Sequence, residues 1–369
     1  MLRLLISTIG TSLLTNQIDQ QSDRQLLNKT ANLTPETIPT EAGNIIEKLK
    51  SKASEKLKQG VKEIRRASAE LNGIYGLYQE QLEQGRQDMH FLIATDTAQG
   101  QATANVVKSF LQTQGLTVDT YTPSGLSTAS TESFSHGIDK LLEWIDDTIP
   151  NYEESGYKVC FNLVGSFKSL QGYLNTIGMF YADEIIYIFE GSSEVITIPR
   201  LPISLDNSVI QPYVVEFALM AQGAEVNRSK LPGVPETLIF AVDDEVTLRN
   251  WGRLIWNRSK EQLLSKDLLA FPQIRYEPSF VRDYERVRSN SERVKLQEIL
   301  AKVAHLLIKN NGDTGALKGD GGVLYEVYKN KGGIGHFRVT QGLRVSCVVS
   351  DEGLLLRHYG AHDYVNDNP

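Results

Sequence analysis

Three of the chain's six histidines, His336, His358 and His362, lie within its last thirty-four residues. An imidazole side chain can donate or accept a proton near neutral pH, and it is also a common metal ligand. A metal site would need His358 and His362 on one helix face, but Gly360 lies between them and no glutamate follows the first histidine. We therefore expect acid–base chemistry without a bound metal or another cofactor.

Cleavage of RNA without a metal needs a base for the 2′-hydroxyl, a cation for the phosphate and an acid for the leaving oxygen. Strand alternation places Glu326 with Tyr328 on one face, and His336 with Arg338 on one face of the next strand. The same alternation is also typical of the solvent-facing side of an antiparallel sheet. The candidate catalytic residues are Glu326, Lys329, His336, Arg338, His362 and Tyr364.

A second group of candidate residues follows two apolar runs in the first half of the chain. Small hydroxyls, backbone N–H groups at a helix start and one lysine are the components of an anion site. Ligands of parallel sheets bind where the carboxyl ends of the strands meet. Ordinary tight strand–helix turns remain the alternative interpretation. The candidate ligand residues are Thr8, Gly10, Thr11, Ser12, Gly165, Ser166, Phe167 and Lys168.

The first two hundred residues alternate between apolar strand patterns and amphipathic helix patterns, which indicates βαβ units and a doubly wound parallel sheet. The predicted strands span residues 2–10, 90–96, 116–123, 157–165 and 184–191, and the predicted helices span residues 97–115, 136–149 and 169–182.

Three other segments complete the predicted organisation. A polar, charge-alternating insert at about 17–87 is typical of a solvated helical hairpin, with a lid or partner surface as the alternative. Residues 206–275 are predicted to form a helical connector. Residues 276–369 read as two helices followed by four short strands, a small α+β domain with an antiparallel sheet.

Composition narrows the function classes. A net charge of −7 argues against a wholesale nucleic-acid coat, although the chain from Tyr276 onward holds 13 Lys+Arg and 12 Asp+Glu. The two cysteines, Cys160 and Cys347, lie in apolar runs and are expected to be buried and reduced. No window has the roughly 18 apolar residues of a membrane span, and the start lacks a cleavage pattern. We expect a cytoplasmic protein without membrane or DNA partners.

Three segments carry a resemblance: STIGTSLLTN near the start, NLVGSFKS after the fourth predicted strand, and EVITIPRLPI at the end of the sheet. Together they resemble the CARF domains of type III CRISPR systems, and more narrowly the subfamily that includes ring nucleases. The resemblance covers residues 1–205 and implies a Rossmann-like fold. It also implies a homodimer that binds cyclic oligoadenylate, most often cyclic tetra-adenylate, across its two-fold axis.

The resemblance further implies roles for two residues. In related ring nucleases a matching serine and lysine bind the ligand and cleave it slowly, and here these positions hold Ser12 and Lys168. The second loop departs from the family pattern, because many members have Gly-Gly where this chain has Gly165-Ser166. The departure leaves the expectation of ligand binding in place and weakens the expectation of slow ring cleavage.

The last ninety residues resemble RelE-type toxins, the ribosome-dependent mRNA interferases. The order of two helices, an LKGDGG loop, YEVYK, GHFRV, an apolar strand and GAHDYV is similar to that family's order over residues 276–366. The resemblance implies that Arg338 clamps a phosphate, Glu326 acts as general base and His362 as general acid, with Tyr364 stacking on a base. His336 and His358 are reserve candidates.

Arg357 and His362 also match the arginine–histidine spacing of HEPN ribonucleases, but their flanks have a strand pattern rather than a helical one. Together the CARF and RelE resemblances imply a ribonuclease that cleaves mRNA on the ribosome and is activated by cyclic tetra-adenylate. The alternatives are a ring nuclease with an inactive C-terminal domain, a HEPN-type ribonuclease, and a non-enzymatic CARF regulator.

Overall fold

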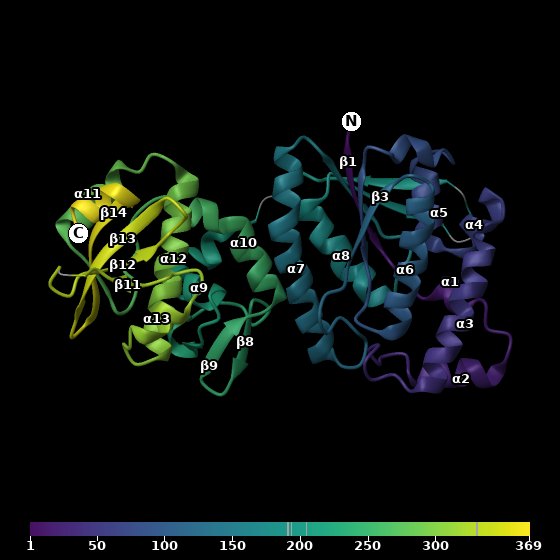
Figure 1. Cartoon of the computed structure of the whole chain (residues 1–369), viewed down its shortest axis with the longest axis horizontal. Coiled ribbons are helices and arrows are strands. Elements are labelled where there is room, and N and C mark those ends of the chain that lie inside the picture. The colour runs from purple at the N-terminus through teal and green to yellow at the C-terminus, as the bar shows by residue number, and fades with distance from the viewer. Residues whose placement is uncertain (190–191, 193, 204, 330) are drawn as a thin grey trace. The chain divides into compact units, whose positions relative to one another are not determined.

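The computed structural model describes residues 1–189, 192, 194–203, 205–329 and 331–369. The chain forms two compact units, Met1–Ile203 and Ser204–Pro369, and each has its own apolar core. Figure 1 follows the first unit from purple to teal and the second from green to yellow. No helix among these described residues is both long and apolar enough to cross a membrane.

A six-stranded sheet with the order β3-β2-β1-β4-β5-β6 organises the first unit. All neighbouring strands are parallel except β6, which is antiparallel to β5. The predicted doubly wound parallel sheet is confirmed, whereas the antiparallel edge strand was not predicted. The last two residues of the predicted strand 184–191 lie outside the described residues. The strands are β1 (Arg3–Thr8), β2 (Met89–Ile93), β3 (Thr117–Tyr121), β4 (Lys158–Asn162), β5 (Glu184–Ile188) and β6 (Val195–Pro199).

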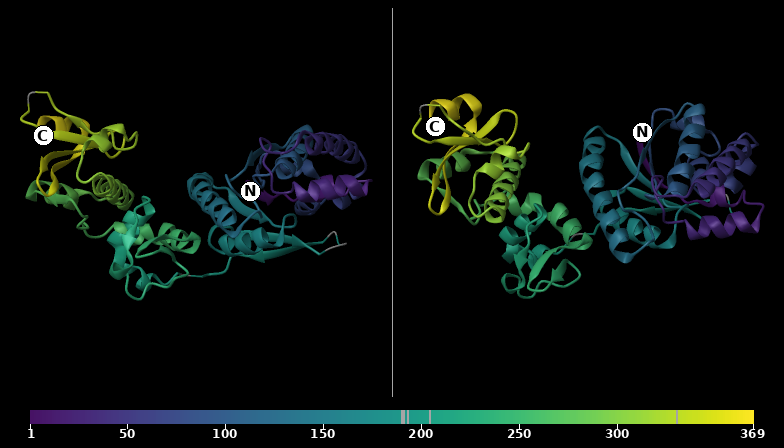
Figure 2. Two further views of the ribbon diagram at one scale, coloured as in Figure 1. Left: turned by 90° about the horizontal axis from the view of Figure 1, so that it is seen from below. Right: turned by 60° about the horizontal axis from the view of Figure 1, so that its bottom comes forward.

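Helices cover both faces of this sheet, as Figures 1 and 2 show. The face that presents Leu5 and Cys160 packs against α6 (Ala98–Thr113) and other helices of the same core cluster. The opposite face packs against α7 (Thr131–Glu154) and α8 (Lys168–Tyr181), for example through Phe91, whose ring contacts Trp144 of α7 edge-on at 4.9 Å. Because both faces are buried, the strands consist of nearly continuous apolar residues.

The insert at about 17–87 is more deeply embedded than its charge pattern predicted. Helix α1 (Ser12–Thr15) lies just before the insert. The insert itself forms α2 (Gln21–Lys29), α3 (Thr40–Lys56), α4 (Val61–Ala67), α5 (Ala69–Leu77) and the short helix η1 (Leu82–Gly85). Apolar residues of these helices, such as Ile46, Leu49 and Leu71, are buried in the core of the sheet. The prediction of a solvated hairpin projecting from the sheet was therefore wrong, because one face of each long helix is apolar and packs inward.

The second unit is built on a five-stranded sheet with the order β10-β14-β13-β12-β11. Strands β11 to β14 pair antiparallel, as the sequence predicted, and β10 adds a parallel pair with β14. Figure 2 shows the light-green helix α12 against the yellow strands in both views. The elements are β10 (Ile274–Tyr276), α11 (Pro278–Arg286), α12 (Asn290–Lys309), α13 (Gly315–Gly319), β11 (Glu326–Val327), β12 (Gly335–Arg338), β13 (Leu343–Ser350), β14 (Gly353–Ala361) and α14 (His362–Asp367).

Residues 206–275 belong to this second unit and contain strands that the prediction of a helical connector missed. The strands β7 (Val226–Asn227), β8 (Ile239–Val242) and β9 (Glu245–Leu248) form a small antiparallel sheet beside the helices α9 (Val214–Ala221) and α10 (Asn250–Leu264). The short helices are η2 (Asn207–Val209), η3 (Gln211–Tyr213) and η4 (Arg228–Lys230). The buried residues of α9, α10 and the small sheet share one apolar cluster with α12 and the large sheet. Residues 206–275 are therefore part of the same core.

Substitution of Trp256 tests whether residues 206–275 and the large sheet share one hydrophobic core. Trp256 of α10 is 2% exposed and lies in the same cluster as Phe337 and Val345 of the large sheet. We expect Trp256→Ala to cost about 3–5 kcal/mol of unfolding free energy, and to weaken hydrogen-exchange protection of β13 and β14 together with that of α10. Phe240→Ala is the matched control, since Phe240 is 49% exposed on β8. Unchanged protection of β13 in Trp256→Ala would mean two separate cores.

Candidate functional site

The two predicted ligand loops meet at the carboxyl edge of the first sheet. β1 and β4 are neighbours, with Ser7 paired to Asn162, so the residues that follow each strand emerge side by side. The Thr8 hydroxyl donates a hydrogen bond to the Gly165 carbonyl, which ties one loop to the other. The structure thus brings the predicted GTS and GSFKS stretches together.

A cavity of about 400 Å³ lies over these loops. Thr11 and Ser12 line it from the first loop, and Ser166 and Phe167 from the second. Polar side chains from other elements complete the wall, among them Thr97, the N-cap of α6, whose side chain accepts from the Gly100 amide. Lys168, which follows Phe167 as the first residue of α8, is exposed and is not among the residues that line the cavity. Hydroxyls, backbone amides at a helix start and a nearby cation suit a phosphodiester ligand.

Ser166 is held in an unfavourable backbone conformation at this cavity. Its φ of 131° lies in the region that glycine adopts readily and L-residues do not. Its hydroxyl oxygen is buried and has no hydrogen-bond partner among the described residues. The chain thus places a serine in a backbone conformation that suits glycine, at the position where its sequence has Gly-Ser in place of Gly-Gly.

Glu70 lies directly beneath both loops and was missed by the sequence analysis. It is fully buried in α5, and its carboxyl accepts hydrogen bonds from the Gly10 amide at 2.5 Å and from the Ser68 hydroxyl at 2.6 Å. A methyl group at Gly165 would overlap this carboxyl, so glycine is required for the close approach. Burial raises the pKa of Glu70, against the opposing effect of these hydrogen bonds.

A wider hollow of about 1030 Å³ continues from the cavity and shares Ser12, Ala69 and Val164 with it. Its lining includes Lys62 and Arg66 of α4. Arg66 pairs with Glu63 and the acid Glu80 also lines the hollow, so Lys62 is the α4 cation here for which no ion pair is described.

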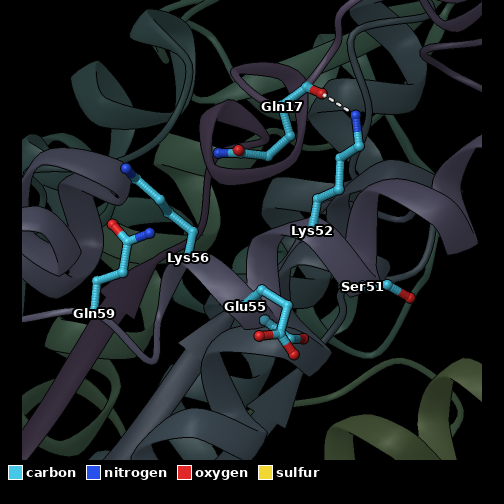
Figure 3. Close-up of a pocket in the computed structure, with 7 residues that line it drawn as sticks. Gln17, Ser51, Lys52, Glu55, Lys56 and Gln59 are labelled. Carbon is cyan, nitrogen blue, oxygen red and sulfur yellow. Dashed lines mark hydrogen bonds between the residues drawn. The ribbon is translucent and has the colours of Figure 1, made fainter.

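Another hollow, of about 670 Å³, lies over α3 and is drawn in Figure 3. Lys52 reaches the Gln17 carbonyl at 3.5 Å and forms an ion pair with Asp19, and Lys56 pairs with Glu63. These cations are already neutralised by surface carboxylates, and none of the predicted site residues lies here. This hollow is a solvated helix face.

The predicted catalytic face of the second unit is built by cross-strand pairing. Glu326 of β11 pairs with His336 of β12, His336 pairs with Ser346 of β13, and Ser346 pairs with His358 of β14. Directly opposed residues of antiparallel strands point to the same face, so these four side chains form one row across the sheet. The opposite face, with Phe337 and other apolar residues, packs into the core.

Aromatic and amide contacts connect this row to α14. The Tyr328 ring stacks on the His336 ring with centroids 4.4 Å apart, and the Tyr328 hydroxyl donates to Asn366 Oδ1 at 2.6 Å. Asn366 Nδ2 lies 3.2 Å from the ring nitrogens of His362. Partial burial lowers the pKa of His336, so a neutral ring is favoured at pH 7. Glu326, His336 and His362 thus gather around Tyr328 and Asn366.

Arg338 and Arg344 form the next row and face each other across β12 and β13. Like charges directly opposite one another are unfavourable, and burial, together with the nearby Arg338, lowers the pKa of Arg344. The Arg338 Nε is buried without a hydrogen-bond partner among the described residues. Arg344 is largely buried and its Nη1 donates to the carbonyls of Thr340, Gln341 and Leu343. Arg338 is therefore the member of this pair that could receive an anion.

Tyr364 and His358 belong to a separate cluster centred on Asp283 of α11. The Asp283 carboxylate accepts from the Tyr359 amide at 3.2 Å and from the Tyr364 hydroxyl at 3.2 Å, and its Oδ2 lies 3.0 Å from His358 Nδ1. Tyr364 therefore contacts the His358 end of the row, with its hydroxyl 3.3 Å from His358 Nδ1, whereas His362 contacts Asn366. Lys329 is exposed in the turn after β11.

Arg357 does not take part in an arginine–histidine pair of the HEPN kind. It is the extra residue of a bulge in β14, and its Nε lies 3.3 Å from Glu277 Oε1. The surrounding unit combines an antiparallel sheet with helices, whereas that motif belongs to an all-α domain. Within the described ranges no three His, Cys, Asp or Glu side chains gather closely enough to hold a metal ion.

Comparisons with known proteins connect the first unit to CRISPR systems. Residues 65–201 match the model of a CRISPR-associated protein family, Cas_APE2256. This match includes Glu70 and the Gly165–Lys168 loop, but not the loop that follows β1.

Two solved structures resemble part of the chain. A chain of the RelB–RelE antitoxin–toxin complex from Methanococcus jannaschii is 13% identical with a TM-score of 0.20, and the match covers 26% of this chain and 96% of that one. A copper-bound mutant toxin from Helicobacter pylori is 16% identical with a TM-score of 0.20, covering 26% and 99% respectively. TM-scores this low do not establish a shared fold.

Replacing Ser166 by glycine tests the strain in the ligand loop. Relief of the positive φ is worth about 1–3 kcal/mol, and the greater flexibility of glycine offsets roughly 0.5–1 kcal/mol of it. We expect Ser166→Gly to raise the melting temperature of the first unit by about 2–4 °C, measured by differential scanning calorimetry. Ser169→Gly, in the first turn of α8, is the control and should destabilise. A lower melting temperature for Ser166→Gly would show that the loop is not strained.

Proposed function

We propose that this protein is a ribonuclease of CRISPR antiviral defence that is switched on by cyclic oligoadenylate, with cyclic tetra-adenylate as the activator. The observation that carries the nuclease part is the single sheet face that presents Glu326, His336 and the arginine pair Arg338–Arg344. The ligand part is supported by the cavity over the two loops and by the match of residues 65–201 to a CRISPR-associated family.

The ligand would bind over the carboxyl edge of the parallel sheet. Ser12 and the loop amides would bind phosphate oxygens, and Lys168 would supply a positive charge beside them. A ring of several nucleotides would extend from the cavity of about 400 Å³ into the adjoining hollow, and two copies of the chain facing one ring, as the CARF resemblance implies, would enclose it. The active species is therefore a homodimer. Slow cleavage of the ring would use Lys168 to stabilise charge on the phosphate.

RNA cleavage would follow from the residues of the second unit. Glu326 removes the proton of a 2′-hydroxyl, and the 2′-oxygen attacks the adjacent phosphorus. Arg338, with Arg344 beside it, stabilises the charge on the phosphate oxygens. The bond to the 5′-oxygen breaks as His362 gives that oxygen a proton, which leaves a 2′,3′-cyclic phosphate and a free 5′-hydroxyl. Tyr364, 38% exposed, and Lys329 would contact the bases and backbone of the RNA.

The first test uses purified protein with end-labelled mRNA on translating ribosomes, and free RNA as a control, each with and without cyclic tetra-adenylate. We expect cleavage only when ligand and ribosome are both present. Lys168→Ala should abolish activation, whereas Lys52→Ala, on the solvated face of α3, should behave as wild type. Cleavage at equal rates without ligand would contradict the switch. Silence in every lane, with the cyclic ligand converted to a linear product, would leave a ring nuclease.

The second test removes the acid–base and phosphate groups one at a time. Glu326→Gln keeps the shape of the side chain but removes its basicity, and Arg338→Gln removes the positive charge; each should slow RNA cleavage by about 10²–10⁴-fold. Both variants should bind cyclic tetra-adenylate as tightly as wild type, because they lie in the other unit. Arg275→Gln is the control, since Arg275 pairs with Glu352 on the exposed surface of the same sheet. Full activity of the Arg338→Gln variant would exclude the proposed phosphate clamp.

A further inference from the structure

The Glu70 carboxyl is the buried junction between the two ligand loops. It is 0% exposed, and the Gly10 amide and the Ser68 hydroxyl are its hydrogen-bond partners. From the β4 side, Gly165 approaches so closely that any side chain there would collide with it. The backbone carbonyl of Glu70 also accepts from Asn162, which in turn bonds to Ser7 of β1. Glu70 therefore contacts the loop after β1 and the loop after β4 at the same time.

Among the residues that the structure describes, no Lys, Arg or His forms an ion pair with this carboxyl. Its neighbours from the α4–α5 junction, from β1 and from β4 are Ser68, Gly10 and Gly165, and none of them is charged. The nearby Arg65 of α4 pairs with Glu80 at 2.6 Å and donates to Asn72 at 2.7 Å, among other contacts. An unpaired buried carboxylate is costly, and an anionic ligand above Gly10 and Gly165 would make it more costly still.

We propose that Glu70 is a positioning residue of the ligand site that carries a proton when an anionic phosphodiester ligand is bound, so that ligand binding takes up a proton. This role rests on the proposed binding of cyclic oligoadenylate. Protonated Glu70 still accepts the Gly10 amide through one oxygen, and its own O–H can donate to Ser68. The loops keep their geometry, and no second negative charge lies beneath the phosphates.

The pH dependence follows from the direction of the pKa shift. Burial already raises the pKa of Glu70 above 4.5 in the free protein, and a bound phosphodiester raises it further. At pH values between the free and the bound pKa, the free protein must take up a proton in order to bind. The affinity therefore falls as pH rises through this window, by up to about tenfold per pH unit. Below the window the affinity is constant.

The experiment measures the affinity of fluorescent cyclic tetra-adenylate for the full chain by anisotropy, from pH 5 to 9 at constant ionic strength. Glutamine has the shape of a protonated glutamate, so Glu70→Gln should bind as wild type does at low pH, and with no pH dependence. Glu55→Gln is the control, because Glu55 is an exposed acid of α3 that pairs with Lys58 away from the ligand loops, and it should leave the wild-type slope unchanged. Identical slopes for wild type and Glu70→Gln would overturn the proposal.

A second measurement keeps the test valid if Glu70→Gln does not fold. Calorimetric titration of the wild type in two buffers of different ionisation enthalpy should show uptake of up to one proton per site within the window. Ser68→Ala removes a hydrogen bond that favours the charged form, so the fall in affinity should move to higher pH. Binding without proton uptake would overturn the role of Glu70 alone. A wild type that binds no cyclic tetra-adenylate at any pH would overturn the proposed function as well.

Discussion

The adjacency of β1 and β4 determines where chemistry can occur in the first unit. The strand order turns from descending to ascending at this pair, with β2 and β3 on one side and β5 and β6 on the other. Connections leave in opposite directions at such a point, and a space opens above the two strands. The sequence places small residues and hydroxyls in both loops, so the space is lined by donors. The buried Glu70 then joins the two loops from below.

In the second unit, the pairing register of the strands brings the candidate catalytic residues onto one face of the large sheet. Glu326, His336, Ser346 and His358 come from four strands and have no common spacing in the sequence, yet each is directly opposite the next. The bulge at Arg357 shifts β14 by one residue, and this shift places His358 opposite Ser346. The exposed α14 is anchored on this face by Val365, which is fully buried. A single change in register would therefore dismantle the row.

The sequence predicted correctly those helices and strands whose apolar pattern lies within one continuous segment. The central strands of the first sheet, β1, β2, β4 and β5, are mostly apolar, and the order of helices and strands after residue 276 is regular. The prediction failed where burial depends on a distant partner. Glu70 was interpreted as a solvent-exposed charge of the insert, because the residues next to it in the sequence do not indicate that Gly10 and Gly165 cover it in the fold. Asp283 and Asn366 were missed for the same reason, since their partners are set by packing across α11, β14 and α14.

The pairing of β10 with β14 has a consequence for how this chain can be divided. Ile274, Arg275 and Tyr276 fill the outer edge of the large sheet, and the predicted domain boundary at 275/276 passes through this strand. A fragment that began there would leave part of the β14 edge with unpaired amides and carbonyls, which is a template for aggregation. It would also lack the helices that complete its core. Residues 276–369 therefore depend on residues 206–275 both for a paired sheet edge and for a complete apolar core.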